Sequence, residues 1–396
     1  MWLSVTDDLA RNRATVFFRF FLALPHLIVL GAFVLAGVLM APFVWVYVLV
    51  TGDLSESLRD FYMRLIRYSV HVNAYLHLAA EPWPPFVGGD TYPVDVGFPL
   101  PQRQNRWGVG FRLLLAFPAL LLSGTLGAGL VSTNVSVYYL SFGVTSAAAF
   151  LAWFAILATG RMPAGLRDLI AYALGYGAQA MAYLFLLTAV YPDSNPAWAR
   201  LPALRQHPVA LKVQRHDPYR HRLLVFFRGP LTLPHYVWLA LWAIPALFAA
   251  ILAWFAALFT GRVPRPFHRF LSAYVRQNAQ VAAFANLTAN PFPAFVPVAG
   301  AYPLELSVSE PVTQSRWTIG FRLILALPAL VLASTLGSVL LIASVLGWFA
   351  SLFTAKMPHG IRNASAFTIR YTAQTFAYLA LLTERYPHAG PGPCDF

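Results

Sequence analysis

One apolar segment occurs four times in this chain, and it limits the possible folds more than any other feature of the sequence. Each copy opens with Phe-Arg, carries a proline six residues after the arginine, and ends with a tryptophan that is followed six residues later by threonine. Two fixed spacings that recur four times identify an internal repeat. The arginines that open the copies, called the anchor arginines below, are Arg19, Arg112, Arg228 and Arg322.

The repeated segments carry no charge over long runs, which cover residues 20–52, 113–160, 229–261 and 323–355. Three of these runs contain 33 residues. A helix of that length is about 50 Å long, whereas the hydrocarbon core of a bilayer is about 30 Å thick. The lengths therefore predict two helices joined by a tight turn in each run, or eight transmembrane helices in four hairpins. The residues expected near the turns are Gly31, Gly37, Gly127, Gly129, Pro245 and Gly337.

The composition also indicates a membrane protein, because 58% of the residues are hydrophobic and only 11% are charged. Soluble domains carry about 25% charged residues. The formal net charge is +13, and all 28 Lys and Arg residues lie outside the charge-free runs. Under the positive-inside rule, this pattern predicts one cytoplasmic face in contact with anionic lipid headgroups, and no nucleic-acid partner. We expect a multi-pass protein of the inner (plasma) membrane with both termini in the cytoplasm.

A further helix is expected after each run, and these helices start near Leu58, Leu166, Phe267 and Ile361. In the first repeat, Arg64 and Arg67 lie on one face of this helix, whereas Leu65 and Tyr68 lie on the other. This pattern is typical of an amphipathic helix at the membrane interface. The copy at residues 169–192 carries no charge and is alternatively a further span.

Short runs with apolar residues at period two precede the apolar segments and predict β-strands on the cytoplasmic side. They lie at residues 92–98, 207–213 and 302–308, with a shorter remnant at Leu3 and Val5. We expect these four strands to form one small sheet. The predicted fold class is therefore an all-α polytopic membrane protein with internal repeats, interfacial amphipathic helices and short cytoplasmic-side strands.

The four repeats form a duplicated pair. Repeats 1 and 3 share Leu-Pro-His, whereas repeats 2 and 4 share Arg-Trp and Thr-Leu-Gly. With an even number of spans in each half, the halves would be parallel repeats about an axis along the membrane normal. The expected boundaries are 1–91 and 92–195 for the first pair, 196–206 for a linker, 207–301 and 302–390 for the second pair, and 391–396 for a tail.

The repeat resembles the domain of unknown function DUF4389. The resemblance rests on an aromatic-Arg pair followed by Ala-Leu-Pro-His at residues 18–26, on the tryptophan-to-proline motif at 254–264, and on the Tyr-Pro ending at 187–192. It covers nearly the whole chain, but repeat 1 has Asp53 and Leu54 where the family pattern has Arg-x-Pro. The family has no assigned activity, so the resemblance implies the repeated architecture and no catalytic residue.

The anchor arginines are the first candidate binding site. They could form a ring of cations that binds lipid phosphates or an anionic substrate, or they could be interfacial arginines that reach the headgroups. His26 and His235 follow equivalent prolines in the two halves. Neither has a second ligand at metal spacing, so we predict packed, hydrogen-bonded histidines and no metal site.

A polar residue also recurs on the last helix of each repeat. The four residues are His71, Gln179, Gln280 and Gln374. We expect their side chains to form hydrogen bonds across the interface between repeats, as polar groups do between membrane helices. A structural role is favoured over a binding role.

The sequence carries no sign of catalysis, because it has no nucleophile elbow, phosphate loop, zinc-helix motif or paired carboxylates. We therefore predict no enzymatic activity, no catalytic residue and no cofactor. The favoured function is a scaffold or accessory subunit of a membrane complex, with anionic lipid headgroups and a protein as partners. The alternative is a transporter of lipid or small anions with a site between the two halves. A membrane enzyme that acts on lipid is the third hypothesis.

Overall fold

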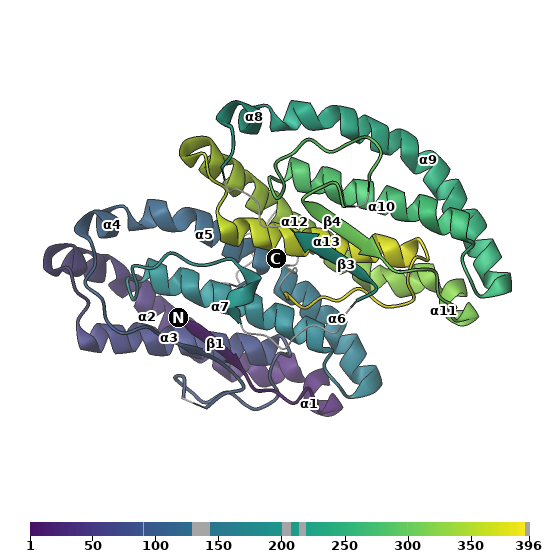
Figure 1. Cartoon of the computed structure of the whole chain (residues 1–396). Helices are drawn as coiled ribbons and strands as arrows, with labels where there is room; N and C mark the ends of the chain where they lie inside the picture. Colours follow the sequence, from purple (N-terminus) through teal and green to yellow (C-terminus); the bar gives the residue numbers. More distant parts are fainter. Residues whose placement is uncertain (90, 129–142, 200–206, 214–218, 299, 393–396) are drawn as a thin grey trace. The chain divides into compact units, whose positions relative to one another are not determined.

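The computed structural model describes residues 1–89, 91–128, 143–199, 207–213, 219–298 and 300–392. The chain forms two compact units, Met1–Pro202 and Ala203–Phe396, and each unit contains two repeats (Figure 1). The boundary between the units falls inside the segment 196–206, which was predicted to be a linker. The expected turn residue Gly129, the polar insert at 132–136 and the end of the tail lie outside the described residues.

The first unit has three layers: a two-stranded sheet, a middle layer of two helices, and an outer layer of apolar helices. The sheet and the middle layer consist of β1 (Trp2–Val5), β2 (Val94–Gly97), α3 (Glu56–Leu76) and α7 (Ala164–Leu184). The outer layer consists of α2 (Arg19–Thr51), which packs on α3, and of α5 (Arg112–Leu126) and α6 (Val144–Thr159), which pack on α7. The short elements are α1 (Arg13–Phe17), α4 (Arg106–Gly110) and a 3-10 helix at Pro196–Ala199.

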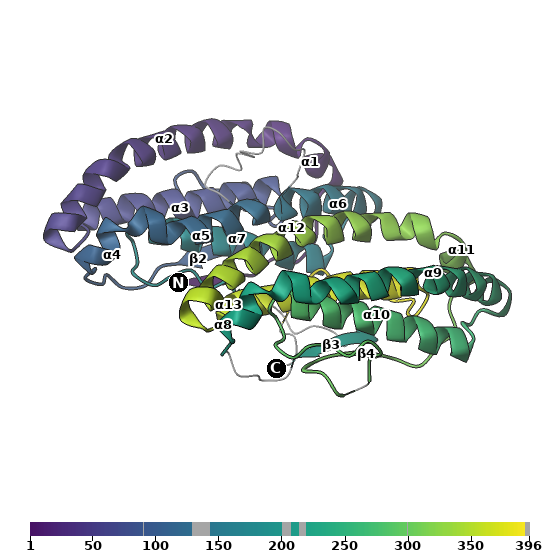
Figure 2. The same cartoon turned by 90° about the horizontal axis from the view of Figure 1, so that it is seen from above.

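The second unit repeats this arrangement. Its sheet and middle layer consist of β3 (Val209–Val213), β4 (Leu304–Val308), α10 (Arg265–Ala285) and α13 (His359–Leu379). Its outer layer consists of α9 (Arg228–Thr260) over α10 and α12 (Arg322–Thr354) over α13, preceded by α8 (Arg222–Phe226) and α11 (Arg316–Gly320). Figure 2 shows α9 on one side of α10, and β3 and β4 on the other side.

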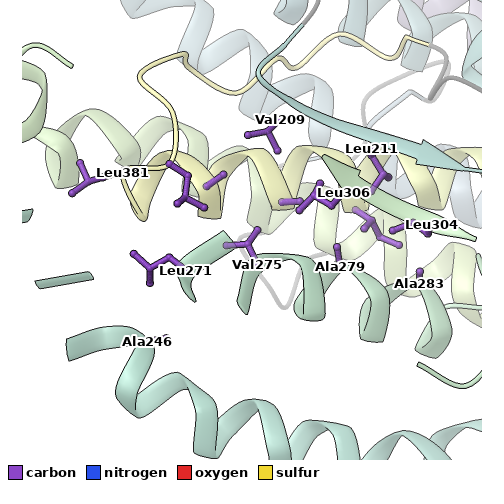
Figure 3. Packing of buried hydrophobic residues seen from close by; sticks show 14 of the residues in the cluster. Val209, Leu211, Ala246, Leu271, Val275, Ala279, Ala283, Leu304, Leu306 and Leu381 are labelled. Carbon is purple, nitrogen blue, oxygen red and sulfur yellow. The ribbon is translucent and has the colours of Figure 1, made fainter. Parts of the chain in front are cut away.

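The core of the second unit lies between its sheet and its middle layer. Leu211, Leu304 and Leu306 of the strands face Val275 and Ala279 of α10 (Figure 3). All five side chains are buried. Burial of such apolar side chains contributes about 1.5–3 kcal/mol for each large residue. This core therefore fixes the sheet on the middle helices.

The predicted hairpins are wrong for three of the four runs, because α2, α9 and α12 are each one continuous helix of 33 residues. Pro25 lies inside α2 and Pro245 inside α9. An apolar helix without polar turn residues bends at a proline and continues beyond it. Gly37 has a packing role, since a Cβ atom there would lie 2.7 Å from Cδ2 of Leu65 in α3. In repeat 2 the corresponding run forms the two helices α5 and α6.

The four predicted strands form two antiparallel sheets and not one sheet. In the first, Leu3 pairs with Val96, and in the second, Leu211 pairs with Leu306. Each sheet contacts the two middle helices of its own unit. Every strand therefore finds its partner in the other repeat of the same pair, which joins the two repeats.

The predicted amphipathic helices exist and begin two residues before the expected positions, but they form the buried middle layer and not an interfacial layer. Their polar faces find partners on the strands. Nε of Arg67 lies 3.2 Å from Asp95 of β2, and Nε of Arg276 lies 3.4 Å from Glu305 of β4. The copy without charge from residue 169 onward belongs to α7, which packs among α3, α5 and α6.

The outer helices expose long apolar surfaces. Among the described residues, α2, α9 and α12 are long and apolar enough to cross a membrane, by length and composition. Phe43 of α2 is 78% exposed and Phe259 of α9 is 74% exposed. Exposed apolar patches of this extent mark contact with a membrane or with another protein.

The Thr-Gly pairs end the outer helices as predicted. Gly52, Gly160 and Gly261 have φ values of 81°, 73° and 75°, the left-handed conformation of a helix C-terminal glycine. Ala355 takes the same place after α12 with φ of 57°. A Cβ atom makes this conformation costly, so the fourth repeat ends its helix with strain.

Candidate functional site

The anchor arginines begin the outer helices, one in each repeat, and their side chains are buried. Each guanidinium carbon lies 4.0–4.1 Å from the centroid of an aromatic ring on the middle helix of the same repeat. This distance is typical of a cation–π contact. The pairs are Arg19–Tyr75, Arg112–Tyr183, Arg228–Phe284 and Arg322–Tyr378.

The chain segment that follows the middle helix binds the anchor arginine. Nη1 of Arg322 donates to the carbonyl oxygen of Thr383 over 3.1 Å. Nη2 of Arg19 lies 2.7 Å from the carboxylate of Glu81. Arg112 donates to the carbonyl oxygen of Thr188, and Arg228 donates to that of Ala289. Each guanidinium is therefore engaged inside its own repeat.

A leucine in the left-handed conformation shapes this segment in every repeat. The four residues, with φ of 58–65°, are Leu78, Leu186, Leu287 and Leu381. The turn closes the end of the middle helix, because the amide of Ala80 donates to the carbonyl oxygen of Ala74 over 3.1 Å. Turns of this kind satisfy the last carbonyl groups of a helix. The turn also supplies the carbonyl groups that bind the arginines.

A second set of buried polar residues was missed by the sequence analysis. These residues lie eight positions before the anchor arginines and are Arg11, Gln104, Arg220 and Gln314. Nε of Arg11 donates to the carbonyl oxygen of Leu78 over 3.2 Å, and Nε2 of Gln314 donates to that of Leu381 over 2.6 Å. Oε1 of Gln314 also accepts a hydrogen bond from Arg322. The alternation of Arg and Gln at one fixed spacing is the signal that could have revealed them.

Exposed arginines form a third set, six positions before the anchor arginines. These residues are Arg13, Arg106, Arg222 and Arg316. Three of them donate to carbonyl groups near the end of the outer helix of the neighbouring repeat, in the pairs Arg13–Ala158, Arg106–Val50 and Arg222–Phe353 at 3.0–3.1 Å. Trp107 and Trp317, next to two of these arginines, are largely exposed. Arginine beside exposed tryptophan is typical of a membrane–water interface.

His26 and His235 are fully buried. Nδ1 of His26 lies 2.8 Å from the hydroxyl group of Tyr68. The ring of His235 packs against Phe292 and Phe295, whose ring centroids each lie 4.5 Å from its own. Burial raises the pKa of Tyr68 to about 12, so its phenol stays neutral. Within the part of the chain that the structure describes, no three or more His, Cys, Asp or Glu residues are placed to hold a metal ion.

The recurring polar residues of the middle helices bind strands and post-helix segments. His71 and Gln374 each bind a strand of the other repeat in their pair, whereas Gln179 binds within its own repeat. The observed pairs are His71–Asp95, Gln179–Asp193 and Gln374–Val209, each at 2.9 Å. Gln280 is also buried. The strands cover this face of the middle helices, which is why the polar groups meet them first.

Comparison with known proteins agrees with the fourfold repeat. A family model described as "Domain of unknown function (DUF4389)" matches residues 13–88, 134–194, 222–296 and 316–389. Three of these matches begin at or within a few residues of a short helix and its exposed arginine. No curated protein and no solved structure matches the chain.

Proposed function

The chain belongs to the DUF4389 family, and we propose that it is a non-catalytic membrane scaffold or accessory subunit. The observation that carries this proposal is the burial of the anchor arginines, whose residues are only 1–3% exposed. Carbonyl and carboxylate groups of the same repeat already accept their hydrogen bonds. Buried cations that are held by groups of their own repeat favour a structural role over the binding of a transported anion.

We infer further that the outer layer lies along the membrane within one leaflet. α2 and α3 run antiparallel, since Arg19 contacts Tyr75 and the hydroxyl group of Tyr62 donates to the carbonyl oxygen of Gly37 over 2.8 Å. If α2 crossed the bilayer, Arg64 of α3, which is exposed, would lie near its middle. A charge at that depth costs about 3 kcal/mol.

The dimensions of the layers agree with this arrangement. A helix with its side chains is about 10–12 Å across, whereas half of a 30 Å hydrocarbon core is about 15 Å deep. One layer of helices therefore fits one leaflet. Both charged ends of each apolar run then stay on one side of the membrane without a hairpin, and the sheet faces water.

The exposed arginines and tryptophans suit the edge of such a layer. Arg106 with Trp107, and Arg316 with Trp317, start short helices next to the apolar layer. A guanidinium group near the surface attracts an anionic headgroup by about 1 kcal/mol. These exposed arginines, and not the buried anchor arginines, are therefore our proposed contacts for anionic lipid.

Cysteine labelling tests the membrane arrangement. In a chain with Cys394→Ser, single cysteines replace His221 and Arg262 near the two ends of α9, and Ser338 in α12. An impermeant maleimide is added to either side of sealed vesicles. We expect one side to label both ends of α9, and neither side to label position 338. Labelling of the two ends from opposite sides would show a spanning helix, and labelling of position 338 from the far side would show a hairpin.

Purification in native lipid nanodiscs tests the scaffold function. We expect a stoichiometric protein partner that is lost with Lys212→Glu on the exposed face of β3. Lys356→Glu, the same charge change in the loop after α12, is the matched control and should retain the partner. A stoichiometric anion without a protein partner, released by Arg322→Gln in a folded chain, would instead support the transporter.

A further inference from the structure

An apolar cavity of about 710 Å³ lies in the second unit, between α9, α10, α12 and α13. Its wall includes Leu247 and Ile251 of α9, Leu271 of α10 and Leu379 of α13. Ala246 of α9 and Leu271 of α10, which also line the cavity, are labelled in Figure 3. The volume is within the range of about 300–1,000 Å³ that small-molecule sites occupy.

Two residues fill the equivalent place in the first unit. The rings of Tyr62 and Phe185 stack there, with centroids 4.7 Å apart and an angle of 19° between their planes. Their equivalents are Leu271 and Ala380, because α10 and α13 have the same lengths as α3 and α7. Both of these smaller residues line the cavity. The second unit therefore has smaller side chains along this cavity where the first unit has an aromatic stack.

The hydrogen bond of the aromatic stack is also missing from the second unit. In the first unit, the hydroxyl group of Tyr62 donates to the carbonyl oxygen of Gly37 and holds α2 against α3. Leu271 has no group that could make this bond to Ala246, the equivalent of Gly37. Without that bond, and with less side-chain volume, α9 leaves space above α10.

The cavity is partly open, and its apolar wall is unfavourable when empty or in contact with water. Interiors are close-packed, and the atoms that line a void lose their dispersion contacts. Water does not compensate in an apolar cavity, because a buried water needs about three hydrogen-bond partners. The cavity therefore calls for an apolar occupant.

We infer that this cavity holds an acyl chain of a membrane phospholipid. Two of its lining residues, Leu323 and Phe376, are also exposed, so the cavity opens onto the apolar exterior of the unit. Arg322 is the charged lining residue, but its Nη atoms already donate to Thr383 and Gln314. The residue of Arg322 is also only 1% exposed. The wall thus takes a hydrocarbon chain and keeps its cation away from a headgroup. This inference rests on the proposed membrane anchoring.

Photo-crosslinking in nanodiscs tests the inference. The probe is a phosphatidylcholine with a diazirine at the middle of one acyl chain, and mass spectrometry locates the adducts on the full chain. We expect adducts on Leu271 and Ala380 inside the cavity, and on Phe259 of the outward face. Ala380→Phe together with Leu271→Tyr rebuilds the aromatic stack of the first unit, and should lower the cavity adducts at least tenfold without changing those on Phe259.

The reciprocal variant is the matched control. Phe185→Ala with Tyr62→Leu should open the first unit and create new adducts around position 185. If the double variant of the second unit does not fold, Ala380→Phe alone provides the test. Cavity adducts that persist in the folded variant would overturn the inference, as would adducts formed by a diazirine fatty acid but not by the phospholipid. If adducts were absent both from the cavity and from Phe259, the proposed membrane anchoring itself would be contradicted.

Discussion

Nε1 of Trp254 donates a hydrogen bond to the carbonyl oxygen of Ile319 over 2.9 Å. Trp254 lies near the end of α9 in repeat 3, whereas Ile319 lies in the short helix α11 of repeat 4. Trp348 of repeat 4 returns the same bond to Val225 of repeat 3 over 2.9 Å. In the first unit, Trp45 likewise donates to the carbonyl oxygen of Val109 in the short helix of repeat 2. These tryptophans therefore join the end of one outer helix to the short helix that precedes the other.

Trp254→Phe should lower the free energy of unfolding by about 1–2 kcal/mol, because the buried carbonyl group of Ile319 loses its donor. Trp317→Phe is the control, since this exposed side chain should change stability by less than about 0.5 kcal/mol. Reversible denaturation in detergent micelles measures both. Equal effects of the two substitutions would mean that the hydrogen bond does not stabilise the pair.

Ala355→Gly should raise the free energy of unfolding by about 1 kcal/mol, because glycine takes the left-handed conformation without a Cβ clash. Gly261→Ala at the equivalent place in repeat 3 should lower it by about the same amount. Thermal unfolding of the two variants beside the unmodified chain provides the measurement. A shift of both midpoints in one direction would contradict the assignment of strain to φ.

Arg322→Gln should lower the free energy of unfolding by about 3 kcal/mol, since it removes a buried cation–π contact and a carbonyl partner. Arg316→Gln, six residues earlier and exposed, should be nearly neutral for stability. The same two proteins are then compared for retained anionic lipid by native mass spectrometry. We expect the amount of retained anionic lipid to fall with Arg316→Gln. If it fell only with Arg322→Gln, in a variant that remains folded, the anchor arginines would be the anion site instead.

Acid should destabilise the chain through His388. Burial, together with the nearby Arg370, His207 and Arg385, lowers the pKa of this imidazole to about 4. The unfolded chain, with a histidine pKa of about 6.5, then binds a proton that the folded chain does not. Stability contributed by the neutral imidazole is present above pH 6.5 and falls as the pH drops toward about 4. His388→Gln should weaken the dependence of the free energy of unfolding on pH between about 4 and 6.5. An unchanged dependence on pH would show that His388 is not the group responsible.

The sequence predicted those parts of the fold that depend on local pattern. The Thr-Gly ends, the helices that start near Leu58 and Leu166, and the period-two strands all follow from residues close together in the chain. The prediction of hairpins was wrong because it assumed that every apolar helix must cross the bilayer. Gly37 then looked like a turn residue, although its missing side chain serves the approach of Leu65.

The candidate site was predicted in its residues but not in its contacts. The spacing identified the anchor arginines, yet the aromatic partner of Arg19 lies 56 positions away, on another helix, at Tyr75. The strand partner of His71 was equally hidden, because nothing near His71 indicates which strand will cover α3. Which distant residues become partners depends on how the layers pack, and the spacing of residues along the chain does not contain that information.

The pairing of the strands also implies a delay during synthesis of the chain. Ser4 of β1 and Asp95 of β2 face each other although they lie 91 positions apart. At about 5–20 residues per second, the first strand waits about 5–20 seconds for its partner. Through that interval the nascent chain carries an unpaired strand edge beside an apolar helix. The smallest piece that can leave the ribosome with every strand paired is thus a pair of repeats, and the second pair has the same delay between β3 and β4.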